Sequence, residues 1–226
     1  MGIMPGAEAK GKKPKYKVYK LAHHAQNFAK ALGVQEVNYA GRVDVANVCN
    51  HGLFVCRQRG VPMPRGVRVG PITPASPDEV TLADYTPNLS GAAGDITINV
   101  AAPEWQNIAE YAWTRRAEQD ISTGDPRHFI VHELGELVLE QSAGFDNANP
   151  LGAYYEAVEE QFQQEDLGHI YEVLGDRATH NHGEFVAETF AALMLGRAAE
   201  LHQDGEIMKL YERYGGAGVR QYDESL

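Results

Sequence analysis

Two short apolar segments of this chain contain a histidine and four glutamates, residues that are seldom buried without a partner. The first segment contains His132, Glu133 and Glu136, and the second contains Glu184 and Glu188. Residues four apart in a helix lie on one face, so each segment presents two of these side chains one turn apart. A buried glutamate needs an ion pair, hydrogen bonds or a bound cation. One metal ion is the simplest partner for the whole set.

The first segment has the features of a helix that begins after Asp125 and ends near Ser142. Asp125 fits the capping position and Pro126 fits the first helical position. Glu133 lies about 100° around this helix from His132, where it would reach a water bound to the same metal. Gly135 costs about 1 kcal/mol relative to alanine inside a helix. Its small size lets another element pass close to the helix.

The two segments resemble the zincin metallopeptidases, and within them the gluzincin group. The sequence Glu-Phe-Val-Ala-Glu-Thr-Phe at 184–190 is similar to that of lethal-factor-like and phage-encoded zincins, and so is the Asp-Pro start of the first segment. The resemblance covers about residues 95–200. It implies an α+β fold that is zincin-like, mostly helical, with a small sheet and two metal-site helices.

The resemblance also implies roles for individual residues. His132 would be the first metal ligand, Glu133 the catalytic general base and Glu184 the third ligand. Glu188 would accept a hydrogen bond from the far nitrogen of His132. Glu136 stands where the family has its second histidine, and a carboxylate oxygen can also bind zinc. A centre with one histidine and two carboxylates acidifies its water less and favours harder ions such as Mn²⁺, Mg²⁺ or Ca²⁺.

Three further histidines lie near these residues. His180 and His182 precede Glu184, and we expect them in the second shell, where either could replace the missing ligand or stabilise an oxyanion. The alternative places both in a polar loop. His128, one turn before His132, is interpreted as solvated or as an orienting group. In an inactive site, Glu136 would instead pair with a basic group such as Arg177 or Lys209.

These residues support two main hypotheses of function. The first is a zinc-dependent metallopeptidase, a hydrolase that acts on a protein or peptide. The second is a catalytically inactive zincin-like structural or assembly protein, such as a component of a phage virion. A dinuclear carboxylate site ranks last, because the paired Glu-x-x-His motifs of such sites are missing.

The charge distribution limits the partners that this chain can have. The formal charge is −11, yet residues 1–35 contain seven Lys and one Glu, a net charge of +6, which leaves −17 for the remainder. An acidic body argues against nucleic acid as the main ligand. The basic N-terminal arm would either contact an acidic partner, in a homo-oligomer or a virion, or be a solvated tail.

The expected cellular compartment rests on three observations: no membrane helix, no secretory signal and two isolated cysteines. No apolar run reaches the ~18 residues of a membrane helix, and the polar N-terminus is unlike a secretory signal. Cys49 and Cys56 lie about 10 Å apart along a helix, too far for a disulfide. We therefore expect buried thiols in a reducing compartment, which places the protein in the cytoplasm or in a virion.

The chain length suits one domain with additions. We expect a basic flexible arm at 1–14, a helical and loop region at 15–90 and a zincin-like domain at 91–226. Strands are expected near Val67–Val69 and at Ile96–Val100, with loops in the rest of 61–94. Besides the site helix, helices are expected at 16–33, 43–59, 104–119, 152–166, 168–175, 183–201 and 205–213.

Overall fold

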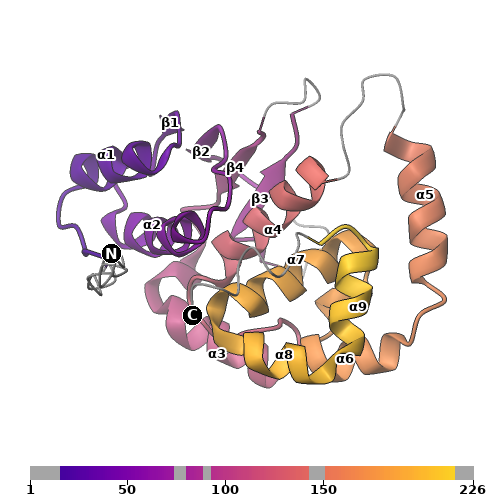
Figure 1. Ribbon diagram of the computed structural model, residues 1–226. Coiled ribbons are helices and arrows are strands. Elements are labelled where there is room, and N and C mark those ends of the chain that lie inside the picture. Colours follow the sequence, from indigo (N-terminus) through magenta and orange to yellow (C-terminus); the bar gives the residue numbers. More distant parts are fainter. Residues whose placement is uncertain (1–15, 74–79, 89–92, 143–150, 217–226) are drawn as a thin grey trace, which may run out of the picture.

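The computed structural model describes residues 16–73, 80–88, 93–142 and 151–216, with side chains from 156 onward in the last range. A small sheet lies among helices from both halves of the chain, and the C-terminal half is helical (Figure 1). The fold is therefore α+β, as the sequence predicts. The basic arm at 1–14 lies outside the described residues.

The sheet has four strands in the order β1-β2-β4-β3. They are β1 (Glu36–Val37), β2 (Gly66–Val69), β3 (Ala83–Thr86) and β4 (Asp95–Ile98). β2 is parallel to β1 and to β4, whereas β3 is an antiparallel edge strand on β4. The sequence indicated β2 and β4. The loop prediction for the rest of 61–94 was wrong at β3, because one buried pair, Ala83 and Tyr85, is too short an alternation to stand out.

The two regions predicted at 15–90 and from 91 onward share one sheet and one hydrophobic core. β3 and β4 lie on either side of that boundary and pair with each other in register. The buried apolar residues form one cluster that runs from Ala25 to Tyr214.

The N-terminal helices are α1 (Ala22–Leu32) and α2 (Val43–Gln58), which pack against each other. Cys49 and Cys56 are free, buried thiols of α2, as predicted. After the sheet come η1 (Pro103–Asn107) and α3 (Ile108–Ala117).

The remaining helices surround the central pair, α4 (His128–Ser142) and α7 (His182–Ala192). The helix expected at 183–201 is broken, because Gly196 has a φ of +107° within η3 (Leu193–Arg197). None of the described helices combines the length and apolar composition needed to cross a bilayer. The others are α5 (Leu151–Phe162), α6 (Leu167–Leu174), η2 (Arg177–Thr179), α8 (Ala198–Asp204) and α9 (Glu206–Arg213).

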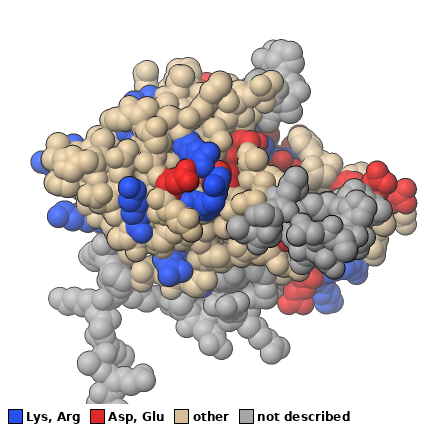
Figure 2. Space-filling view, turned by 90° about the horizontal axis from the view of Figure 1, so that it is seen from above, with Lys and Arg blue, Asp and Glu red and all other residues tan. Residues whose placement is uncertain are grey.

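Charges on the sheet strands are paired across the strands. Arg65 and Arg68 both contact Asp95, and Arg68 also contacts Glu36 at 2.7 Å. On the face shown in Figure 2, acidic and basic side chains lie beside each other near the centre and form no broad surface of one sign.

Gly135 lets α4 and α7 touch at backbone distance. A Cβ atom at this position would lie 2.8 Å from the Cα of Ala187 and 3.2 Å from the Cβ of Phe190. Both contacts are on α7, and the nearer atom is backbone that cannot move aside. The glycine therefore sets the separation of the two helices that contain the predicted site.

We expect Gly135→Ala to lower the free energy of unfolding by about 1–3 kcal/mol, because the added methyl group overpacks this contact. Gly168→Ala in α6 is the control, since its Cβ would meet only Asp166 Oδ1, at 3.2 Å. There the better helix propensity of alanine should leave stability equal or higher. Urea denaturation measures both variants, and a stable Gly135→Ala protein would contradict this account.

Glu140 connects the other end of α4 to the edge strand β3. Its side chain is buried, receives a short hydrogen bond from the Tyr85 hydroxyl, and accepts the Asn88 N–H at 3.2 Å. Burial raises the pKa of Glu140 to about 7, against the opposing effect of the Asn88 N–H.

The raised pKa of Glu140 makes stability depend on pH. The folded protein holds this proton more tightly than the unfolded chain, so the stabilisation is present below about pH 4 and is lost as pH rises through about 7. Glu140→Gln should remove this slope, and its stability relative to wild type should increase from about pH 5 to about pH 8. Urea denaturation across that range tests this, with Glu172→Gln on exposed α6 surface as the control. Parallel pH profiles for wild type and Glu140→Gln would refute it.

Candidate metal centre

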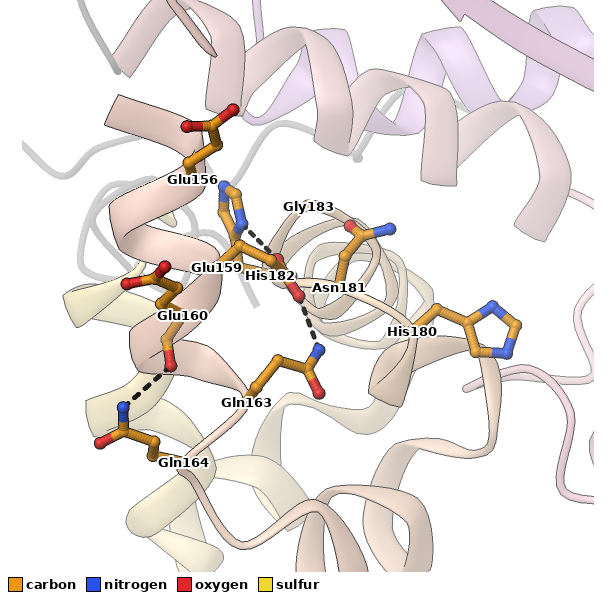
Figure 3. Close-up of a pocket in the computed structure, with 9 residues that line it drawn as sticks. All are labelled: Glu156, Glu159, Glu160, Gln163, Gln164, His180, Asn181, His182 and Gly183. Atoms are coloured by element: carbon orange, nitrogen blue, oxygen red, sulfur yellow. Dashed lines mark hydrogen bonds and ion pairs between the residues drawn. The ribbon is translucent and has the colours of Figure 1, made fainter. Parts of the chain in front are cut away.

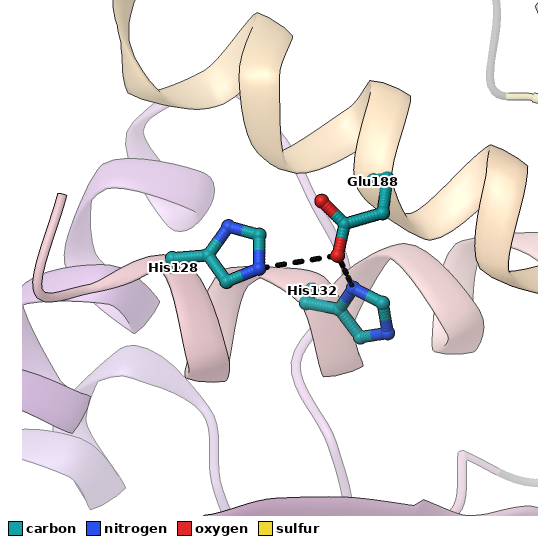
Figure 4. Close-up of side chains that lie close together, drawn as sticks. All are labelled: His128, His132 and Glu188. Atoms are coloured by element: carbon teal, nitrogen blue, oxygen red, sulfur yellow. Dashed lines mark hydrogen bonds and ion pairs between the residues drawn. The ribbon is translucent and has the colours of Figure 1, made fainter. Parts of the chain in front are cut away.

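Glu188 of α7 is a fully buried carboxylate that holds two histidines of α4. Its Oε1 lies 3.0 Å from His132 Nδ1 and 3.2 Å from His128 Nε2, and both rings point at this one oxygen (Figure 4). Its Oε2 accepts the Ser122 N–H at 2.7 Å. The Ser122 hydroxyl also donates to the backbone carbonyl of Glu188, at 2.8 Å. These contacts satisfy the carboxylate and fix the rotation of α7 against α4.

The position of Glu188 determines the tautomer of His132, that is, which ring nitrogen carries no hydrogen. Burial raises the pKa of Glu188, but His128 and His132 outweigh it and hold the pKa well below the usual value. An ionised carboxylate only accepts hydrogen bonds, so Nδ1 of His132 must carry the hydrogen. In the neutral ring, Nε2 then presents a lone pair. This is the form in which histidine binds a metal.

Two carboxylate oxygens face this Nε2 atom. Oε2 of Glu184 lies 3.2 Å away and Oε1 of Glu136 lies 3.8 Å away. His132 Nε2 is buried and has no hydrogen bond of proper alignment, although Glu184 is so close. The three ligand atoms lie within 4.8 Å of one another. Two ligands of a tetrahedral zinc ion are about 3.4 Å apart, so this donor set fits one small cation.

The pKa shifts show how the cluster accommodates its charge. Burial lowers the pKa of His132, but Glu184 and Glu188 raise it well above its usual value. Burial raises the pKa of Glu184, but His132 and Arg177 lower it to about 2. Burial together with Glu133 raises the pKa of Glu136 well above its usual value. Glu184 is thus ionised, and Glu136 resists ionisation.

Glu133 lines a narrow cleft beside the same cluster. Its side chain is 6% exposed, and burial raises its pKa to about 7. The cleft runs between α4 and the segment that leads into β3, and its walls also include Val80, Thr81, Leu82, Ala83, His128, Phe129, His132 and Arg177. The structure therefore places Glu133 next to the predicted ligand His132 in one cleft.

Ser122 was given no role from the sequence, and Arg177 contacts a residue that was not the one expected. Ser122 holds Glu188 from the loop before α4, and no sequence signal marks it. Arg177 was expected to pair with Glu136 in an inactive site. In the structure its Nε donates to Glu184 Oε2 at 3.0 Å. His128 is buried against Glu188, which agrees with an orienting group and excludes the solvated alternative.

The structure does not bring His180 and His182 to the metal cluster. They line a separate cavity of about 900 Å³ between α5 and the start of α7 (Figure 3). His182 Nδ1 lies 2.9 Å from Glu159 Oε2, and the exposed His180 lies 3.2 Å from Asp176. Each ring thus faces an acidic partner other than the predicted ligands, Glu159 for His182 and Asp176 for His180, and the second-shell roles stay a prediction.

The comparisons with known proteins add no relative. No family model, no curated protein and no solved structure matches this chain. The function is therefore argued from the geometry of the cluster.

Proposed function

We propose that this chain is a zincin-like protein that binds one divalent metal ion, zinc foremost, and hydrolyses peptide bonds with low efficiency. His132, Glu136 and Glu184 would be the ligands. One observation carries the proposal, namely a buried histidine nitrogen that faces two carboxylate oxygens at 3.2 and 3.8 Å without an aligned hydrogen bond. Glu184 Oε2 already attracts this nitrogen, and the three donors together suit a cation that would bind all of them at once.

The residues around the cluster suit a hydrolytic reaction. A bound divalent ion would polarise a substrate carbonyl and acidify a bound water. Glu133 lines the same cleft as His132, and it would accept a proton from a water bound at the cluster and pass it to the leaving amine. Glu188 would keep His132 in the required tautomer throughout.

The edge strand favours a peptide as the substrate. β3 pairs with β4 on one side, and no other strand of the described chain pairs with its outer side. The segment that enters β3, including Leu82 and Ala83, forms a wall of the cleft. An extended peptide can add to such an edge through backbone hydrogen bonds. Its scissile bond would then lie near Glu133 and His132.

Glu136 favours the second candidate, a catalytically inactive zincin-like structural or assembly protein. A second carboxylate ligand cancels more of the charge of a divalent ion than an imidazole does, and this weakens its action on water. The raised pKa of Glu136 also opposes the ionised form that binds a metal. A virion component of a phage would be one such protein.

We expect about one zinc ion per chain in protein supplied with zinc, and a small fraction of that in Glu184→Ala. The alanine removes the ionised ligand nearest to His132 Nε2. Elemental analysis after gel filtration measures the content. Glu172→Ala is the control, because this glutamate is exposed on α6 and should leave zinc unchanged. Equal zinc in wild type and Glu184→Ala, or none in wild type, would contradict the proposed site.

We expect Glu136→His to raise both zinc affinity and peptide hydrolysis above the low wild-type level. The neutral imidazole returns positive charge to the centre and lowers the pKa of bound water toward ~7. Adding Glu133→Gln should reduce the gain by about 10²-fold or more, since it removes the general base. Digestion of a peptide library with zinc present compares the three proteins. Strong wild-type cleavage that depends on Glu133 and is not improved by Glu136→His would show that Glu136 is a competent ligand. Metal binding without cleavage in all three would favour the structural alternative.

A further inference from the structure

Arg177 reaches the candidate metal centre from η2. Its side chain is 24% exposed, and its Nε donates to Oε2 of Glu184 at 3.0 Å. The same oxygen atom lies 3.2 Å from His132 Nε2. One carboxylate oxygen therefore faces both the guanidinium and the predicted metal ligand.

The contact between Arg177 and Glu184 also changes the charge around the predicted metal ligands. A divalent ion bound by a neutral His132 and two carboxylates, Glu136 and Glu184, would have its charge cancelled. Arg177 adds one positive charge in the same cleft, and its Nε lies 3.0 Å from the Glu184 oxygen that faces His132. It therefore offsets one of the negative charges that the carboxylates bring to the ion, and an ion whose charge is cancelled less polarises a carbonyl and acidifies water better.

We propose that Arg177 is a positioning residue of the metal centre, which holds Glu184 in the ligand position and offsets one of the negative charges of the surrounding carboxylates. This inference rests on the proposed function. A guanidinium suits both tasks, because its N–H bonds have fixed directions and its charge is permanent. Without it, the Glu184 carboxylate loses the hydrogen bond that orients it and is repelled by the neighbouring glutamates.

The test is zinc affinity, measured on the full chain by competition with a chromophoric chelator. Arg177→Gln should weaken zinc binding by about 10–100-fold, the usual effect of losing a group that orients a ligand. Arg177→Lys should weaken it less, because the charge stays and only the directed hydrogen bond is lost. Arg65→Gln is the matched control. It removes an arginine–aspartate pair on the sheet and should leave the affinity unchanged.

A double-mutant cycle with Glu136→His separates charge compensation from a purely structural role. In the Glu136→His protein one negative charge is already gone, so Arg177→Gln should reduce zinc affinity by a smaller factor than in wild type. A residue that only supports the fold would give equal losses in both proteins. Equal losses therefore overturn the inference.

The remaining outcomes distinguish this inference from the proposed function. Wild-type zinc binding that needs Glu184, with unchanged affinity in Arg177→Gln, overturns the inference alone. An absence of zinc binding by wild type overturns both. If Arg177→Gln does not fold, Arg177→Lys decides. A wild-type affinity in that variant overturns the inference, and a weakened affinity supports it.

Discussion

The buried Glu188 carboxylate is the interaction on which the rest of the centre depends. A charge this deep in the core is stable only when hydrogen-bond donors surround it, and here His128, His132 and Ser122 provide them. These donors come from α4 and from the loop before it, so Glu188 locks the rotation of α7. Glu184 lies one turn earlier on the same face of α7, and this rotation brings it to the other side of the His132 ring.

The separation of the two helices and the position of the cleft have different causes. Gly135 permits backbone contact between α4 and α7, which places the Glu184 carboxylate within ligand distance of the imidazole. At the far end of α4, Glu140 holds Tyr85 and so fixes β3 above the helix. Glu133 therefore faces an edge strand across a narrow cleft.

The sequence predicted the parts of the fold that have strong local periodicity. The helix of His132 and Glu136, the strand at Ile96 and the small residue at Gly135 were all recognisable, because spacing and residue size determine them locally. β3 was not, since its strand character comes from pairing with β4 and from Glu140, 55 residues beyond Tyr85. The second-shell roles predicted for His180 and His182 rested only on closeness in sequence to Glu184. In the structure His182 faces Glu159 of α5, and His180 faces Asp176.

The ionisable groups around His132 Nε2 share their charges in pairs. Glu184 and Glu188 have lowered pKa values, and they face Arg177 and a His132 whose pKa is raised. Burial raises the pKa values of Glu133 and Glu136, so the cluster limits its negative charge by keeping protons there. A proton on His132 Nε2 serves the same purpose, but without an aligned acceptor it is poorly satisfied. A divalent ion at His132 Nε2 would replace the proton and would bind one atom each of His132, Glu136 and Glu184. It would also allow Glu136 to ionise. The arrangement of charges that stabilises the cluster is therefore also one that a bound metal ion would stabilise further.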